Sequence, residues 1–412
     1  MNLTWFKKMA AFEETFEAKP TEEFLHIVEE KTGTPVQQDG SVYKVPFTTI
    51  LAVDPHNNAE RLELATVYGF QVIVSKGKYK VGNKVIYVPI DSLLPQWLED
   101  QLFPADSKIK LHHHRVRQIK IRNLASLGMI VDPEDVVSKV NPAYLTLEQD
   151  LSTILGVTKY EPPFRGQNMN GKVGTPRNRP LENARFHKYG GVNNLRWFPT
   201  FFDNKEVVIQ EKLHGSCCRA SYAKTATNTV WKKLKSLFKL LPEYEYCYGS
   251  NNVQLQERSG YTGYYGTDIY GAVLKKVNAF SKLRRGETIY GELIGPGVQK
   301  NYDYGHAEHH FVLFDVKVEN VDGTQEYLNP EQVELYAKER GFDFVPVLYR
   351  GVFNAELAKQ LSMGSSIYCN KQKVREGIVI KAKVEYSKDS QKKALKLISE
   401  DYLSDASNTD FH

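Results

Sequence analysis

The feature that most constrains the fold of this chain is a series of short apolar segments that each carry or precede a charged side chain. The run Val207–Ile209 predicts a buried strand, which leads into Glu211 and Lys212 and then into Gly215. Glycine permits a tight turn there. A lysine at the end of a buried strand is desolvated, which lowers its pKa and leaves some free amine, a nucleophile. A lone lysine before a turn is more often an ordinary surface lysine, so the later segments of the chain decide between the two interpretations.

The same pattern recurs later in the chain. One Glu or Asp beside one strand is usually a solvated strand end, but here strand-borne Lys, Glu, Phe-Asp, Glu and Lys follow one another in a fixed order. Arg219–Tyr222 predicts a returning strand after Lys212. The stretch Tyr246–Leu255, which contains GSNN, follows it. The later segments are Thr288–Ile294 with Glu292, His310–Val316 with Phe314 and Asp315, Val374–Lys381 with Glu376, and Lys392–Leu403 with Lys393 and Lys396.

Length and composition set outer bounds. The chain has 412 residues, enough for two or three domains, and its 41% hydrophobic and 25% charged content is ordinary for a globular protein. No apolar run approaches a membrane span and no secretory leader is recognisable, so we expect a cytoplasmic protein without membrane contact. The four cysteines lack metal spacing and predict reduced core thiols rather than a zinc site. The net charge of +5 permits a polyanionic partner without requiring one.

Residues 41–160 predict a small β-barrel or sandwich behind an N-terminal appendage, residues 1–40. A basic, His-rich stretch within it suits either a nucleic-acid groove or a solvated face. Consecutive histidines point to opposite faces of a strand, which disfavours a metal site. The predicted strands are Val42–Val45, Thr48–Val53, Leu62–Val67, Gln71–Val74, Val85–Pro89 and Arg115–Ile121. The basic stretch comprises Lys108, Lys110, His112, His113, His114, Arg115, Arg117, Lys120 and Arg122.

Residues 161–180 are rich in Pro, Gly, Asn and Arg and predict a linker to a second domain, residues 181–412. Leu145–Leu155 before the linker predicts a helix. Val230–Leu241 predicts an amphipathic helix whose lysines form a solvated face or contact phosphates.

The stretch from position 56 to 95, which opens His-Asn-Asn-Ala-Glu-Arg-Leu, resembles the OB-fold domains of nucleic-acid proteins. The ordered motifs of the second domain resemble those of the covalent nucleotidyltransferases, and most closely those of ATP-dependent RNA ligases with an OB domain in front. This resemblance covers residues 42–403. It implies an α+β protein with an N-terminal OB-like β-barrel and a C-terminal adenylation domain of antiparallel sheets with flanking helices.

The resemblance also implies roles for single residues. Lys212 of KLHG would attack the α-phosphate of ATP, with Glu211, His214 and Gly215 beside the nucleotide. Phe314 would stack on adenine with Asp315 in support, and Asn252 of GSNN would lie near the ribose or the acceptor. Glu376 would hold Mg²⁺ or Mn²⁺, with Glu292 near the ribose hydroxyls or metal-bound water. Lys381, Lys393 and Lys396 would contact phosphates, and which lysine contacts which phosphate stays open.

The implied reaction has three steps: adenylation of Lys212, transfer of AMP to the 5′-phosphate of a polynucleotide, and attack by a 3′-hydroxyl that releases AMP. The expected substrate is RNA or an RNA-containing nicked duplex, gripped by the OB domain. His214 stands where DNA ligases usually carry Asp, which favours RNA. The alternatives are a DNA ligase, a GTP-dependent capping enzyme, and a nucleic-acid-binding protein whose nucleotidyltransferase domain is a non-catalytic scaffold.

Overall fold

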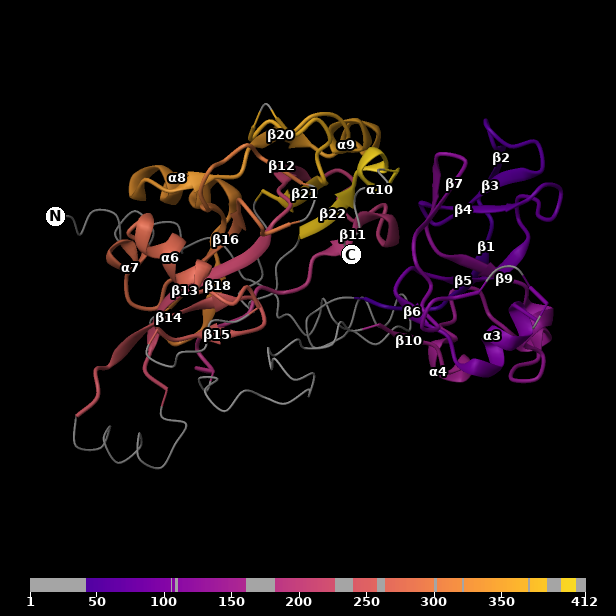
Figure 1. The fold of residues 1–412 in the computed structure, drawn as a ribbon, viewed down its shortest axis with the longest axis horizontal. Coiled ribbons are helices and arrows are strands. Elements are labelled where there is room, and N and C mark those ends of the chain that lie inside the picture. Colours follow the sequence, from indigo (N-terminus) through magenta and orange to yellow (C-terminus); the bar gives the residue numbers. More distant parts are fainter. Residues whose placement is uncertain are drawn as a thin grey trace.

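The fold consists of two lobes of mostly antiparallel strands, seen side by side in Figure 1. The computed structural model describes residues 42–104, 106–107, 110–160, 182–226, 240–257, 264–299, 302–320, 322–369, 371–383 and 394–404. Strands β1 to β10 form the lobe coloured indigo to magenta, and β11 to β22 form the larger lobe. The predicted α+β class is confirmed. The predicted appendage, the linker, most of the helix at 230–241 and Lys393 lie outside the described residues.

The N-terminal lobe is built from four small sheets, and its buried side chains form two clusters, one that includes Phe70 and one that includes Leu98. Alternation of apolar side chains makes β4 half-buried, with Phe70, Val72 and Val74 turned inward. The sheets are β1-β5-β9, β2-β3-β4, β7-β8 and β6-β10. The strands are β1 Phe47–Thr49, β2 Ala52–Pro55, β3 Leu62–Val67, β4 Phe70–Ser75, β5 Lys84–Val88, β6 Ser92–Leu93, β7 Ile119–Ile121, β8 Leu124–Ser126, β9 Met129–Val131 and β10 Thr158–Lys159. The helices are α3 Gln96–Leu102, η2 Pro133–Val136, η3 Pro142–Tyr144 and α4 Ser152–Leu155.

Three predictions for this lobe were wrong. Val42–Val45 forms no strand, because the Val45 amide donates to the Asp150 carboxylate at 2.8 Å instead of to a neighbouring strand. The helix predicted over 145–155 is reduced to its last turn, since Glu148 takes a positive φ of 69° that a helix does not permit. The strand predicted over 115–121 begins only at Ile119.

Arg115, which the sequence places in the basic stretch, is buried rather than exposed. Its guanidinium pairs with Asp91 and lies 3.7 Å from the centre of the Tyr160 ring. The buried arginine therefore supports the lobe internally. The other described members of this stretch face solvent: Lys110, His112, His113, His114, Arg117, Lys120 and Arg122.

The larger lobe contains a five-stranded sheet, β11-β22-β21-β12-β20, and a seven-stranded sheet, β15-β14-β13-β16-β17-β18 with β19 beside β17. Its strands are β11 Asn193–Asn194, β12 Glu206–Lys212, β13 Ser216–Lys224, β14 Tyr244–Ser250, β15 Gln254–Leu255, β16 Thr288–Ile294, β17 His310–Glu319, β18 Gln325–Tyr327, β19 Asp343–Phe344, β20 Val347–Val352, β21 Gly377–Ala382 and β22 Ala394–Ile398. Its helices are η4 Leu195–Trp197, α6 Ile269–Lys276, α7 Ala279–Lys282, α8 Pro330–Arg340, α9 Ala355–Ser362 and α10 Glu400–Ser404.

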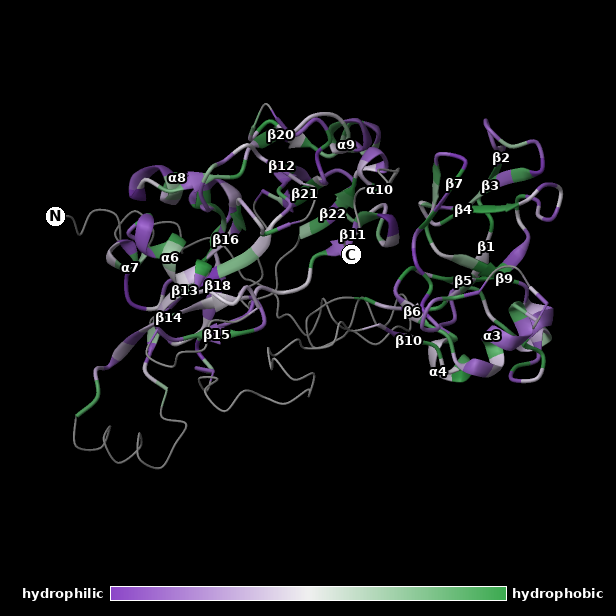
Figure 2. Cartoon of the chain, viewed as in Figure 1, coloured by the Kyte–Doolittle hydropathy of each residue, from purple (hydrophilic) through white to green (hydrophobic). Residues whose placement is uncertain are grey.

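Helices cover one face of each sheet and leave the other for the site. A core that includes Leu274 of α6 and Val333 of α8 packs on the seven-stranded sheet, and one that includes Ala358 of α9 packs on the five-stranded sheet. Figure 2 shows β22 as hydrophobic and α8 as largely hydrophilic, as expected for a buried strand and a surface helix. No described helix is both long enough and apolar enough to cross a membrane.

An aromatic contact joins the two lobes. Trp197 of η4 packs against Tyr68, Phe70 and Tyr87 of the N-terminal lobe, with ring centroids 4.9, 5.0 and 5.8 Å away. The neighbouring Arg196 is buried against Gly69, where an added Cβ would lie 3.0 Å from the arginine Cγ. The lobes therefore meet through packed side chains as well as through the chain that links them.

Candidate active site

Lys212 lies at the end of β12, beside Glu376 at the start of β21. The two strands are antiparallel neighbours, and the Cα of Lys212 is paired with that of Gly377. The buried Val207–Ile209 run fixes the strand, so that Lys212 emerges where the core ends. Its Nζ donates to Glu376 Oε1 at 2.7 Å; the Lys212 side chain is 25% exposed and that of Glu376 is fully buried. Two residues that the sequence singled out separately are thus brought into direct contact.

The low pKa predicted for Lys212 is not found. Burial lowers the pKa of the ammonium, but the Glu376 and Glu292 carboxylates outweigh burial and raise it above the usual value. A carboxylate at hydrogen-bond distance favours the charged form of lysine. Lys212 can therefore act as a nucleophile only after its proton is removed and the field of these carboxylates is compensated.

The second oxygen of Glu376 faces His214. The distance from His214 Nδ1 to Glu376 Oε2 is 3.4 Å, and His214 Nε2 lies 3.5 Å from the hydroxyl of Tyr402 on α10. His214 is buried, and the Tyr304 hydroxyl accepts a hydrogen bond from its backbone amide at 2.7 Å. The histidine is thereby held between Glu376 and the last described helix.

Glu292 of β16 completes the group of charges around Lys212. Burial raises the pKa of its carboxyl to about 7; Lys212 opposes the rise and the neighbouring Glu376 adds to it. Glu292 and Glu376 each make ionisation of the other less favourable. A cation bound between them would stabilise both carboxylates in their charged form.

The donor set fits a hard divalent cation. Carboxylate oxygens suit Mg²⁺ and Mn²⁺, and Mg²⁺ commonly keeps several waters while it binds one or two carboxylates and substrate phosphates. Among the described residues, no group of three or more His, Cys, Asp or Glu side chains could hold a metal. Glu376 and Glu292 would therefore have to share the cation with water and phosphate oxygens. His112, His113 and His114 are among the described residues and form no metal-binding group either.

The two described lysines among the three phosphate candidates occupy different environments. Lys396 of β22 lies close enough to Lys212 for the two charges to repel, and burial together with that repulsion lowers its pKa to about 8. Lys381 of β21 instead donates to the Phe314 carbonyl at 2.7 Å and to Asp315 Oδ2 at 3.2 Å. Lys396 therefore belongs to the Lys212 group, whereas Lys381 supports the β17 strand.

A second group of predicted residues consists of Glu211, Phe314 and Asp315, which are buried or half-buried. Glu211 is buried, and its Oε2 accepts hydrogen bonds from the amides of Ile367 and Tyr368 at 2.8 and 3.3 Å. The other oxygen, Oε1, is buried and finds no hydrogen-bond partner in the described chain. A buried acceptor without a donor is costly, which suggests that a ligand completes it.

Asp315 is fully buried, and burial raises its pKa to about 6 although Lys381 opposes the rise. Its Oδ2 also accepts a hydrogen bond from the hydroxyl of Tyr189 at 2.9 Å. Tyr189 was missed by sequence reasoning because it lies in a segment without regular periodicity. The one local signal was an aromatic residue among polar ones directly before Gly190–Gly191.

The last two predicted residues are Asn252 and Lys393. Asn252 has an exposed side chain, and it is the neighbouring Asn251 that bonds the Tyr189 backbone. Lys393 lies outside the described residues.

Gly215 is required by close packing at the end of the Lys212 turn. A Cβ at this position would lie 2.4 Å from the Leu293 carbonyl oxygen and 2.9 Å from Glu292 Cγ. We expect Gly215→Ala to displace Glu292, to lower the rate of adenylate formation at least tenfold, and to cost about 1–3 kcal/mol of stability, as overpacking typically does. Single-turnover adenylation and urea unfolding measure the two effects. A variant with the wild-type adenylation rate would contradict this account of the turn.

Comparisons with known proteins agree with this arrangement. Residues 205–398, which include Lys212, Glu292, Glu376 and Lys396, match a family model described as RNA ligase. Residues 45–133 match a model described as an OB-fold domain.

The fold is shared with solved structures of one enzyme. The Naegleria gruberi RNA ligase with pyrophosphate is 22% identical; the match covers 88% of this chain and 98% of that chain, with a TM-score of 0.61. A variant of that ligase solved with ATP and Mn is also 22% identical, covers 88% and 98% of the two chains, and gives a TM-score of 0.62. A further variant with AMP and Mn covers 87% and 97% at 22% identity and a TM-score of 0.61. Residues 205–398 therefore match an RNA ligase domain, which lies behind a match to an OB-fold domain, as the resemblance of the motifs implies.

Proposed function

We propose that this protein is an ATP-dependent RNA ligase that works through a covalent lysyl-AMP on Lys212. The observation that carries the proposal is the contact of Lys212 Nζ with Glu376 Oε1 at 2.7 Å, inside a group that also contains Glu292 and Lys396. Nucleotidyl transfer needs a positioned nucleophile and compensation of charge on the phosphate oxygens. Variants of the Naegleria gruberi ligase were solved with ATP and Mn and with AMP and Mn, which supports ATP as the nucleotide and a divalent metal as the cofactor.

In the first step, the lone pair of Lys212 Nζ forms a bond to the α-phosphorus of ATP. The bond from that phosphorus to the bridging oxygen breaks and pyrophosphate leaves. Nζ gives up one ammonium proton to water before the attack and a second proton to water after it, which leaves a neutral phosphoramidate N–H. Lys396 would neutralise charge on the α-phosphate oxygens. A Mg²⁺ or Mn²⁺ held by Glu376 and Glu292 would supply further positive charge, and would compensate the field that keeps Lys212 protonated.

The nucleoside would lie between the two sheets. Phe314 would stack on the base, and the free Oε1 of Glu211 would accept a hydrogen bond from the exocyclic amino group of adenine. Guanine presents an oxygen at that position, which a carboxylate repels, so ATP is preferred over GTP. Glu292 would also lie near the ribose hydroxyls, and Gly215 would let the nucleotide approach the backbone. In the remaining assignments, His214 would position Glu376, and Asp315 and Lys381 would support Phe314. Asn252 would lie near the ribose or the acceptor.

The later steps join two polynucleotide ends. AMP passes from Lys212 to a 5′-phosphate, and the 3′-hydroxyl of an adjacent strand then attacks that phosphate and releases AMP. The proposed substrate is a nicked duplex with RNA on the 3′-hydroxyl side, with its flanks held by the OB-fold domain, where Lys110, Arg117 and Lys120 are exposed. The four cysteines are all free thiols, which fits a cytoplasmic protein.

The test is a sealing assay on a nicked duplex whose 5′-phosphate strand is labelled. We expect a joined product with ATP and Mg²⁺ or Mn²⁺, none with GTP, and none after chelation of the metal. A duplex ending in deoxyribose at the 3′-hydroxyl should be sealed more slowly than one ending in ribose. Equal sealing of both ends would favour a DNA ligase, use of GTP would favour a capping enzyme, and RNA binding without any covalent adenylate would favour a non-catalytic scaffold.

A further inference from the structure

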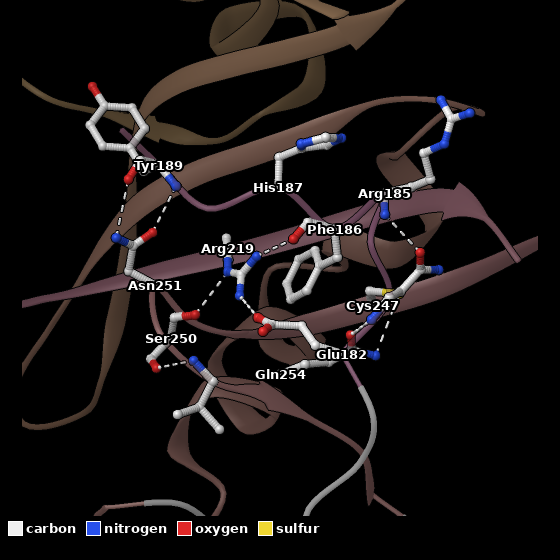
Figure 3. A network of polar contacts seen from close by, with 12 residues as sticks. Glu182, Arg185, Phe186, His187, Tyr189, Arg219, Cys247, Ser250, Asn251 and Gln254 are labelled. Atoms are coloured by element: carbon white, nitrogen blue, oxygen red, sulfur yellow. Dashed lines mark hydrogen bonds and ion pairs between the residues drawn. The ribbon is translucent and has the colours of Figure 1, made fainter. Parts of the chain in front are cut away.

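The segment Glu182–Tyr189 covers the face of the seven-stranded sheet that carries Glu292, and it lies outside the residues matched by the RNA ligase model. Alternation along β16 puts Tyr290 on the same face as Glu292. The Tyr290 hydroxyl donates to the His187 carbonyl at 3.1 Å, so this segment lies directly on that face. Figure 3 shows the segment running along the strands of the sheet.

One buried arginine fixes the start of this segment. Arg219 of β13 has no exposed surface, and its guanidinium donates to the Glu182 carboxylate at 2.6 Å and to the Phe186 carbonyl. It also donates to the Ser250 carbonyl at 2.9 Å, and it lies 3.8 Å from the centre of the Phe186 ring. Each of the three guanidinium nitrogens thus donates to a different residue, and a buried guanidinium bonded in this way holds its partners in one geometry. Figure 3 shows these contacts converging on Arg219.

An asparagine fixes the end of the segment. Asn251 accepts a hydrogen bond from the Tyr189 amide at 2.7 Å through Oδ1, and donates from Nδ2 to the Tyr189 carbonyl at 3.1 Å. This two-point contact imitates the pairing of neighbouring strands. It determines the position of the Tyr189 backbone and hence of its ring (Figure 3).

The Tyr189 ring reaches the Phe314–Asp315 pair. Its centroid lies 4.9 Å from that of Phe314 at an interplanar angle of 74°, an edge-to-face contact. Its hydroxyl donates to Asp315 Oδ2 at 2.9 Å. Lys381 holds the same pair from β21, through the Phe314 carbonyl and the same Asp315 oxygen. Phe314 and Asp315 are therefore held from both sides.

We propose that Tyr189 is a positioning residue for ATP binding, which holds Phe314 and Asp315 in the arrangement that receives the adenine base, and that Asn251 positions Tyr189. This inference rests on the proposed function. A Phe314 ring that is already oriented loses little conformational freedom when the base stacks on it, so the nucleotide binds more tightly. The chemistry at the α-phosphate involves Lys212 and the residues around it, so the rate at saturating ATP should change little.

The test measures the KM for ATP and the maximal rate of lysine adenylation in the full-length protein. We expect Tyr189→Leu to raise KM roughly tenfold, since an edge-to-face aromatic pair and a hydrogen bond to a carboxylate are both lost. The maximal rate should stay within about threefold, which is the pattern of lost ground-state binding. Tyr189→Phe keeps the ring and should restore most of the affinity. Tyr144→Leu, at a tyrosine that is 81% exposed in the other lobe, should leave both parameters unchanged.

Asn251 provides the second variant. We expect Asn251→Ala to raise KM in the same direction, and the double variant with Tyr189→Leu to be no worse than Tyr189→Leu alone, because both act through one ring. An unchanged KM in Tyr189→Leu, a fall only in the maximal rate, or additive effects in the double variant would overturn the inference. If wild type forms no adenylate, the proposed function itself fails, which is a distinct result.

Discussion

Lys212→Ala protein will form no covalent adenylate, whereas wild type will. Among the described lysines, Lys212 is the one placed 2.7 Å from Glu376, at the end of β12. The expected loss is complete within the sensitivity of a gel, because covalent catalysis has no substitute route once its nucleophile is gone. Incubation with α-³²P-labelled ATP and Mg²⁺ or Mn²⁺, followed by a denaturing gel, measures it. The wild-type label should be removed by acid and withstand alkali, as expected for a phosphoramidate.

The matched control is Lys224→Ala, at the exposed end of β13, which should be labelled like wild type. A strand that already carries AMP on its 5′-phosphate bypasses the first step, so Lys212→Ala should still join it to a 3′-hydroxyl at a measurable rate. That result would show that the variant is folded. A labelled Lys212→Ala band would refute the assignment of the nucleophile.

Lys396→Met should lower activity and raise stability at once. The ammonium of the half-buried Lys396 lies near the charge of Lys212, and burial together with that repulsion lowers its pKa to about 8. Removing a charge that compensates phosphate oxygens in a buried site should cost about 10²- to 10³-fold in the rate of adenylation. The same change removes an ammonium that is unfavourable in the folded protein, so the free energy of unfolding should rise by about 1–2 kcal/mol at pH 7.

The pH dependence of the free energy of unfolding tests whether the charge of Lys396 is unfavourable in the folded protein. The pKa of Lys396 is about 8 in the folded protein, against an ordinary lysine value of 10.5. The unfolded chain therefore binds more protons between these values, and the contribution of Lys396 to wild-type stability should rise with pH through that window. Between pH 7 and pH 10, the free energy of unfolding measured in urea should rise less for Lys396→Met than for wild type. Lys224→Met is the exposed control and should match wild type in both measurements. A less stable Lys396→Met protein would contradict the argument.

Local sequence signals succeeded where apolar alternation and turn residues decide the outcome. The strand predicted over Thr288–Ile294 has the same bounds in the structure, and β3 matches the predicted Leu62–Val67. The resemblance that the ordered motifs carry implied the RNA ligase class, and the match of residues 205–398 to the RNA ligase family model agrees with it. The roles of the single site residues stay predictions that the proposed experiments test.

Local signals failed where a distant partner decides the outcome. Arg115 was expected on an exposed basic face, but Asp91 and Tyr160 hold it inside the lobe. Lys381 and Lys396 could not be told apart in sequence, since the contacts that distinguish them come from β17 and from Lys212. The sequence predicted a lowered pKa for Lys212, but the pKa is raised, because Glu376, 164 residues away in the chain, lies against it.

The sequence by itself determined several of the segments that become strands, which of them carry charged side chains, and in what order. Those properties depend on apolar periodicity, turn residues and composition, which are all local. The tertiary structure decided which charges meet, and it alone showed that Tyr189 reaches Phe314 and Asp315 through the contacts of Asn251. Electrostatic and hydrogen-bond energies depend on distances of a few ångströms between groups far apart in the chain, and such distances exist only once the sheets have packed.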